Sequence, residues 1–244
     1  MARRILIIAP FRGIFAIGYA FLAIIILFIS IGYFTTLLKT VGINPIISYL
    51  LAVELALFSL IFSPVNIVIK EINREALVPE VDVIYVFGIP FYLPRITQKI
   101  TKTLIAINVG GAIIPTLLSV TLMYIAFKGM YLFLLLIDLA LLIVICKLFS
   151  RVIPGVGVVM NPLIAPLFSV LISYVTFYKM SYLIPVSAYI SSVLGSLIGA
   201  DLLNLKKIIE SNPQIISIGG MGTFDGIFLS GLFAVMLAEI LLLM

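Results

Sequence analysis

Long apolar runs alternate with short polar segments along this chain. Most runs hold about 20 residues or more, which is the length that a helix needs to cross a hydrocarbon core of about 30 Å. The period-2 alternation of a barrel strand is absent from them. The pattern therefore predicts an all-α polytopic membrane protein with about seven transmembrane helices, at residues 13–37, 44–69, 103–127, 130–149, 156–178, 182–203 and 224–244.

One stretch between the second and third runs is polar enough to lie outside the membrane. Within residues 70–102, the segments 81–87 and 91–96 are rich in β-prone residues, and Gly88-Ile89-Pro90 between them is typical of a turn. We expect a small cytoplasmic β-hairpin here, inserted as a flap into a single membrane domain of residues 1–244. The flap either closes the loop at the interface or offers a strand edge to an extended peptide.

The positive charges indicate an orientation in the membrane. The chain is 64% hydrophobic and 10% charged, with a net charge of +5. Only Lys39, Lys128 and Lys179 flank the runs on one side, and the other twelve Lys and Arg residues lie on the opposite side. Basic residues favour the cytoplasmic side, so we expect a protein of the cell membrane with a cytoplasmic amino terminus and an outer carboxy terminus. The expected partner is the lipid bilayer, not a nucleic acid.

Missing residue types restrict the chemistry. The chain has no histidine, which excludes histidine-dependent zinc sites and Ser-His catalysis, and its one cysteine, Cys146, cannot form a disulfide within the chain. The sequence contains neither of the glycine-rich phosphate-binding motifs G-x-x-x-x-G-K-[ST] and G-x-G-x-x-G. We therefore expect no metal and no cofactor, and any proton chemistry would depend on carboxylates.

Two aspartates stand at the facing ends of the last two runs. Asp201 closes the sixth run and Asp225 opens the seventh, so both are expected at the cytoplasmic face, joined by a loop that contains the glycine cluster 219–222. Two carboxyls held close share one proton, which suits them to act as acid and base on a peptide bond. Structural roles are the alternatives: Asp225 in the first turn of a helix capped by Thr223, and Asp201 in a salt bridge with Lys206 or Lys207.

Other polar and glycine residues fall at the same expected depth. Prolines and glycines interrupt the third and fifth runs there, and such breaks survive in a membrane only against protein or water. The expected lining of the site is Asn66, Asn108, Gly110, Gly111, Asn161, Gly219, Gly220, Gly222, Thr223 and Gly226.

Two resemblances add to this picture. The segment Gly220-Met221-Gly222-Thr223-Phe224-Asp225 resembles the G-x-G-D motif of the presenilin, signal-peptide-peptidase and prepilin-peptidase group, with two residues inserted before the aspartate. That resemblance implies an intramembrane aspartyl protease with Asp201 and Asp225 as its catalytic pair and a single-span membrane protein or peptide as substrate. The chain lacks the Pro-Ala-Leu of the presenilin branch. The stretches N-V-G-G (108–111) and G-G-M-G-T-F-D-G-I-F (219–228) resemble an uncharacterised family of archaeal and bacterial polytopic membrane proteins.

Two further functions fit the same sequence. Glu54 and Asp138 lie near the middle of apolar runs, where acids often mark ion pathways, so a cation-coupled transporter or channel for H⁺ or Na⁺ is one alternative. A non-catalytic scaffold is the other. The sequence leaves the oligomeric state open.

Overall fold

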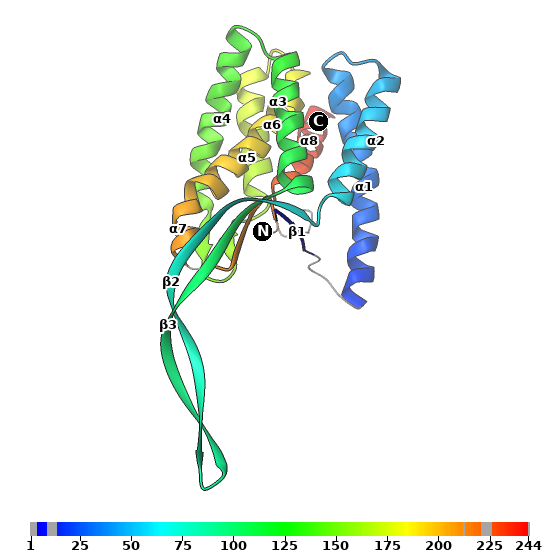
Figure 1. The fold of residues 1–244 in the computed structure, drawn as a ribbon. Coiled ribbons are helices and arrows are strands. Elements are labelled where there is room, and N and C mark those ends of the chain that lie inside the picture. Colours follow the sequence, from blue (N-terminus) through cyan, green and yellow to red (C-terminus); the bar gives the residue numbers. More distant parts are fainter. Residues whose placement is uncertain (1–3, 9–13, 212, 221–225, 244) are drawn as a thin grey trace.

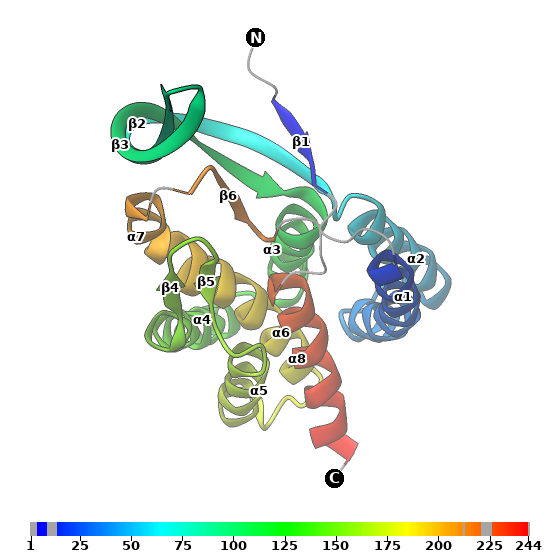
Figure 2. The ribbon, with the colours of Figure 1, turned by 90° about the horizontal axis from the view of Figure 1, so that it is seen from below.

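A bundle of helices surrounds one buried helix, α6 (Leu183–Gly195), in the computed structural model, which describes residues 4–8, 14–211, 213–220 and 226–243. Every residue of α6 is buried. Figures 1 and 2 show its neighbours around it: α3 (Ile114–Ala126), α4 (Met130–Phe149), α5 (Ile164–Phe177) and α8 (Gly226–Leu243). Small residues permit this close approach, because a Cβ on Gly195 would lie only 3.0 Å from the Leu142 side chain of α4.

A helical hairpin packs on one side of this bundle. It consists of α1 (Ile14–Thr40) and α2 (Pro45–Ile61), which contact each other along their length. Phe34 of α1 meets Tyr189 of α6 and Phe228 of α8 edge to face, with ring centroids 5.9 Å apart in both pairs. These aromatic contacts join the hairpin to the central core.

A four-stranded sheet lies at the lower end of the bundle. Its order is β1 (Ile5–Ile7), β2 (Val65–Val86), β3 (Ile89–Asn108) and β6 (Ile215–Ile218), with β6 parallel to β3 and the other pairs antiparallel. Strands β2 and β3 continue beyond the bundle as a long twisted hairpin that turns at Phe87 and Gly88 (Figure 1). The base of this hairpin therefore belongs to the same sheet as β6.

The predicted all-α fold with seven transmembrane helices is wrong, because long strands occupy segments expected to be helical. The run 44–69 is helical only to Ile61 and becomes strand from Val65. Pro64 stands at the break, and a proline disfavours helix in the residue before it. The run 103–127 begins as strand and becomes helical from Val109. The hairpin is accordingly much longer than the small one that we predicted from residues 81–87 and 91–96.

Five helical segments of the described chain are long and apolar enough to cross a membrane. Two shorter apolar helices, α2 and α5, accompany them. Helix α5 begins only at Ile164 because the residues before it form a small hairpin of β4 (Arg151–Ile153) and β5 (Gly157–Val159). The five long segments are Ile17–Thr40, Val109–Ala126, Met130–Phe149, Leu183–Glu210 and Gly226–Leu243.

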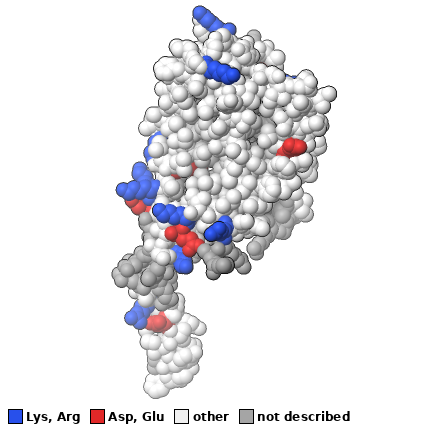
Figure 3. Space-filling model, turned by 45° about the horizontal axis from the view of Figure 1, so that its top comes forward, with Lys and Arg blue, Asp and Glu red and all other residues white. Residues whose placement is uncertain are grey.

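Charged side chains are concentrated away from the flank of the bundle. Figure 3 shows Lys, Arg, Asp and Glu gathered mainly over the hairpin and the adjoining end of the bundle, while the visible flank is almost entirely uncharged. An uncharged flank on helices of spanning length indicates a multi-pass membrane protein. Its orientation stays a prediction.

Candidate functional site

The lower end of α6 changes its winding before it leaves the bundle. It continues as a π-helical segment, η2 (Ser196–Asp201), then as a short 3-10 turn, η3 (Leu202–Asn204), and ends as α7 (Leu205–Glu210). A Cβ on Gly199 would lie 2.4 Å from the Ile143 carbonyl oxygen, so only glycine fits against α4 here. Asp201 is the last residue of η2, and π-helical turns are frequent at functional sites.

A glycine turn lies beside Asp201. Gly219 and Gly220 have φ values of +85° and +96°, which side chains other than glycine rarely adopt. The backbone N–H of Gly219 donates to Asp201 Oδ2 over 3.4 Å. A Cβ on Gly219 would lie 2.3 Å from the Cβ of Ala112, which belongs to a second π-helical segment, η1 (Val109–Ile113). The turn is thus fixed between Asp201 and η1.

A buried network of polar side chains supports this turn. Asn108 Nδ2 donates to the Ser63 carbonyl over 2.6 Å and to Asn66 Oδ1 over 3.2 Å, and Asn108 Oδ1 accepts from Gly111 N over 2.7 Å. Ser217 Oγ lies within hydrogen-bonding distance of Asn66 Oδ1, at 2.5 Å, and of the Gly220 carbonyl. The network joins the starts of β2 and η1 to the strand that precedes the glycine turn.

We expect Asn108→Ala to destabilise the protein strongly. The substitution leaves the Gly111 N–H without its acceptor and the Ser63 carbonyl without its donor. Each buried group that loses its partner lowers the free energy of unfolding by about 1–3 kcal/mol. Asn161→Ala is the matched control, because the Asn161 side chain is exposed and water can replace it as the acceptor for Leu163 N. Thermal unfolding in detergent measures both, and equal midpoints would contradict the supporting role of Asn108.

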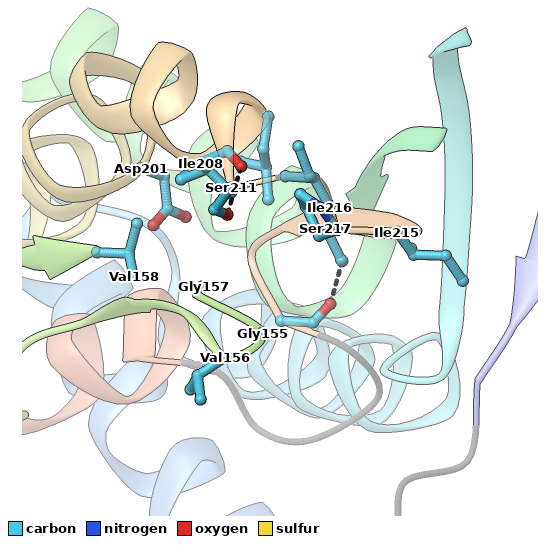
Figure 4. A pocket seen from close by; sticks show the side chains of 13 residues that line it. Gly155, Val156, Gly157, Val158, Asp201, Ile208, Ser211, Ile215, Ile216 and Ser217 are labelled. Atoms are coloured by element: carbon cyan, nitrogen blue, oxygen red, sulfur yellow. Dashed lines mark hydrogen bonds between the residues drawn. The ribbon is translucent and has the colours of Figure 1, made fainter. Parts of the chain in front are cut away.

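Asp201 borders two cavities at this end of the bundle. The larger is about 340 Å³ and is also lined by β5, the end of α7, β6 and Gly220. In Figure 4 the Asp201 carboxylate points into it beside Val158 and Ser211, with Ile216 and Ser217 across from it. The smaller, of about 260 Å³, is lined on its other sides by Val158 to Met160, Pro162, Ser196, Ala200, Gly226, Ile227 and Ser230.

The larger cavity lies between two small pieces of β structure. β6 is the last strand in the order of its sheet, and all four of its residues line the cavity. Gly157 and Val158 of β5 line it from the other side. Strand edges bind extended peptides through their backbone groups, so the two strands that line this cavity suit an extended segment.

Most of the expected site residues come together at this end of the bundle. Asp201, Asn66, Asn108, Gly110, Gly111, Gly219 and Gly220 all belong to the network, the turn or their direct surroundings, and Gly226 lines the smaller cavity. A Cβ on Gly110 would lie 2.1 Å from the Ser59 carbonyl oxygen, which explains that glycine by packing. Asn161 lines neither cavity, although Met160 and Pro162 line the smaller one. Gly222, Thr223 and Asp225 lie outside the described residues.

The two acids expected to carry ions lie in different surroundings. Glu54 is exposed on α2, whereas Asp138 of α4 is 1% exposed and lies against α5 and α6. Among the described residues, no group of three or more His, Cys, Asp or Glu side chains could hold a metal ion.

Sequence reasoning missed Ser217 and both small strands beside Asp201. The sequence Pro154-Gly155-Val156-Gly157 was a usable signal for the β4–β5 hairpin, because proline followed by glycine marks a turn. In the structure, Gly155 and Gly157 adopt φ values of +79° and +110°. Ile215 to Ile218 gave no comparable signal, since four residues are too few to show a period.

Comparisons with known proteins give one match. A family model described as "Protein of unknown function (DUF1614)" matches residues 60–237, which is most of the chain. No curated protein and no solved structure matches the chain. The match agrees with the expected uncharacterised family and gives no support to the resemblance to aspartyl proteases.

Proposed function

Since the chain belongs to the DUF1614 family of proteins of unknown function, we propose a function from its own site: it is an intramembrane aspartyl protease. In this proposal, Asp201 and Asp225 form the catalytic pair. The substrate is a membrane protein or peptide segment that becomes extended near the charged end of the bundle.

One observation carries the proposal. Asp201 borders both cavities, Gly220 borders the larger one and Gly226 borders the smaller one, and these two glycines flank residues 221–225 in the sequence. The aspartate is partly buried, and the cavity beside it is bordered by β5, β6 and the end of α7. An acid that must reach both water and a peptide needs such a place.

The proposed chemistry uses the two carboxyls in opposite protonation states. The ionised carboxylate takes a proton from a water molecule, whose oxygen attacks the carbonyl carbon of the peptide. The protonated carboxyl then gives its proton to the amide nitrogen as the C–N bond breaks. Two carboxyls held close share one proton, which supplies both states at once.

The strand edges define which peptides fit. A peptide bond inside a helix already has its backbone groups paired, so the segment at the site must leave the helical conformation first. An extended segment between β5 and β6 could pair with backbone groups of these strands. We therefore expect the substrate to contain a segment that unwinds easily.

A cleavage assay with purified protein in liposomes tests this function. Single-span peptides that carry a Gly-Pro step within two turns of the membrane face are offered beside versions with Ala-Leu at the same place. We expect cleavage next to the Gly-Pro step and much slower cleavage of the Ala-Leu versions, with the new ends identified by mass spectrometry. If no peptide of the panel is cut by folded protein, the proposal is wrong.

A further inference from the structure

A second cluster of polar groups lies inside the bundle, away from Asp201. Asp138 of α4 accepts from Thr176 Oγ1 of α5 at 2.7 Å on one oxygen. Its other oxygen accepts from Ser187 Oγ of α6 at 2.9 Å and from Ser173 Oγ of α5 at 3.4 Å. The two serine hydroxyls lie 2.9 Å from each other. Five oxygens from three helices therefore meet around one point in the core.

The cluster holds one carboxyl group, and among the described residues no basic side chain contacts it. Its described contacts are the three hydroxyls, and the nearest basic residue along α4, Lys147, is nine residues away, about 14 Å along the axis. Lys147 instead donates to the Leu203 carbonyl and to Asn204 Oδ1. An unneutralised carboxylate in a membrane interior costs several kcal/mol, and hydroxyl groups offset only part of that.

We propose that Asp138, Thr176, Ser173 and Ser187 form a binding site for a dehydrated monovalent cation, with Na⁺ as the ion that fits this oxygen set. One carboxylate balances one positive charge, and hard alkali cations prefer oxygen ligands. Each hydroxyl has two lone pairs and a proton free to rotate, so it can turn a lone pair to the ion while still hydrogen-bonding elsewhere. A divalent ion would leave one positive charge without a partner in the core.

The cluster lies near the connected ends of α5 and α6. Thr176 is the second-last residue of α5 and Ser187 is the fifth of α6, so both lie within two turns of the connection at residues 178–182. Thr176 is only partly buried, unlike Asp138, Ser173 and Ser187. The opposite end of the same helix system holds Asp201, fourteen residues after Ser187 and about 21 Å away along the axis. The two sites are therefore separate, and the ion site does not depend on peptide hydrolysis.

Direct binding of radioactive Na⁺ to the purified, detergent-solubilised protein tests the site. We expect saturable binding of Na⁺, which unlabelled Na⁺ displaces better than K⁺ or choline does at equal ionic strength. We also expect a higher midpoint of thermal unfolding in Na⁺ than in choline. Asp138→Asn is expected to weaken binding by about 100-fold, because it removes the charge that pairs with the ion. Thr176→Val should weaken it by about tenfold through the loss of one ligand.

Two matched variants control for the substitutions themselves. Glu210→Gln makes the same acid-to-amide change at the exposed end of α7, and Ser119→Ala removes a buried hydroxyl that donates to the Pro115 carbonyl. Both should bind Na⁺ as the unaltered protein does. Absence of saturable Na⁺ binding by the folded protein would overturn the proposal. The proposal would also be overturned if the midpoint of thermal unfolding depended on pH in the unaltered protein but not in Asp138→Asn, and did not depend on Na⁺. The carboxyl would then hold a proton in place of an ion. If Asp138→Asn fails to fold, unaltered binding in Thr176→Val would overturn it.

Discussion

Peptide cleavage by the Asp201→Asn variant is expected to be about 10²–10⁴-fold slower than cleavage by the unaltered protein. Asparagine keeps the size of the side chain and can still accept from Gly219 N, so the glycine turn should stay in place. It can neither take a proton from water nor give one to the leaving nitrogen. The initial rate of product formation, followed by mass spectrometry with a peptide from the liposome panel, measures the loss.

Glu210→Gln is the matched control for this prediction. Glu210 ends α7 on the same side of the molecule, is exposed, and lines neither cavity. The same change from acid to amide at this position should leave the rate unaltered. Equal losses in the two variants would mean that charge at this end of the bundle matters, and not a proton-transferring group at Asp201.

Gly219→Ala should be among the most damaging single methyl additions in the chain. The new Cβ would lie 2.3 Å from that of Ala112 and 2.9 Å from the Ala112 backbone nitrogen, and the φ of +85° is strained for alanine. Strain and overpacking together are expected to lower the free energy of unfolding by about 2–5 kcal/mol. Because Gly219 N also donates to Asp201, we expect slower cleavage even at temperatures where the variant stays folded.

Gly42→Ala separates the two causes. Gly42 has a φ of +89°, almost the same as that of Gly219, but nothing lies within 4 Å of the position its Cβ would take. This variant should lose only the conformational part, about 1–2 kcal/mol. Equilibrium unfolding in mixtures of SDS and mild detergent measures both variants. If they lose the same amount, the contact between the glycine turn and η1 contributes nothing to stability.

The hydrophobic pattern predicted some elements well and failed at others for a definite reason. The run 130–149 coincides with α4, because it is apolar along almost its whole length and polar residues, Lys128-Gly129 and Ser150-Arg151, bound it on both sides. The runs 44–69 and 103–127 each combine a helix with one end of the long hairpin, since a buried strand and a buried helix are both simply apolar. Length could not separate them, and only Pro64 and Gly110-Gly111 marked the change of structure.

The site was partly predictable because its residue types are unusual in apolar runs. Buried asparagines and adjacent glycines are costly in a membrane helix, and Asn66, Asn108 and Gly219 do meet around one turn. Their partner Ser217 could not be singled out, because serine is also common in closely packed helices. Asp138 was singled out as an acid within an apolar run, but its hydroxyl partners were missed for the same reason, since Ser187, Ser191, Gly195 and Gly199 recur every four residues as in a closely packed helix.

The central claim is that Asp201 and Asp225 act as one catalytic pair, and a double-mutant comparison tests it most directly. Cleavage rates of Asp201→Asn, Asp225→Asn and the double variant are measured in liposomes, with folding checked by thermal unfolding. Groups that act as a unit have effects that do not add, so we expect all three variants to show the same low residual rate. Substantial cleavage by folded Asp225→Asn, or losses that multiply in the double variant, would contradict the account.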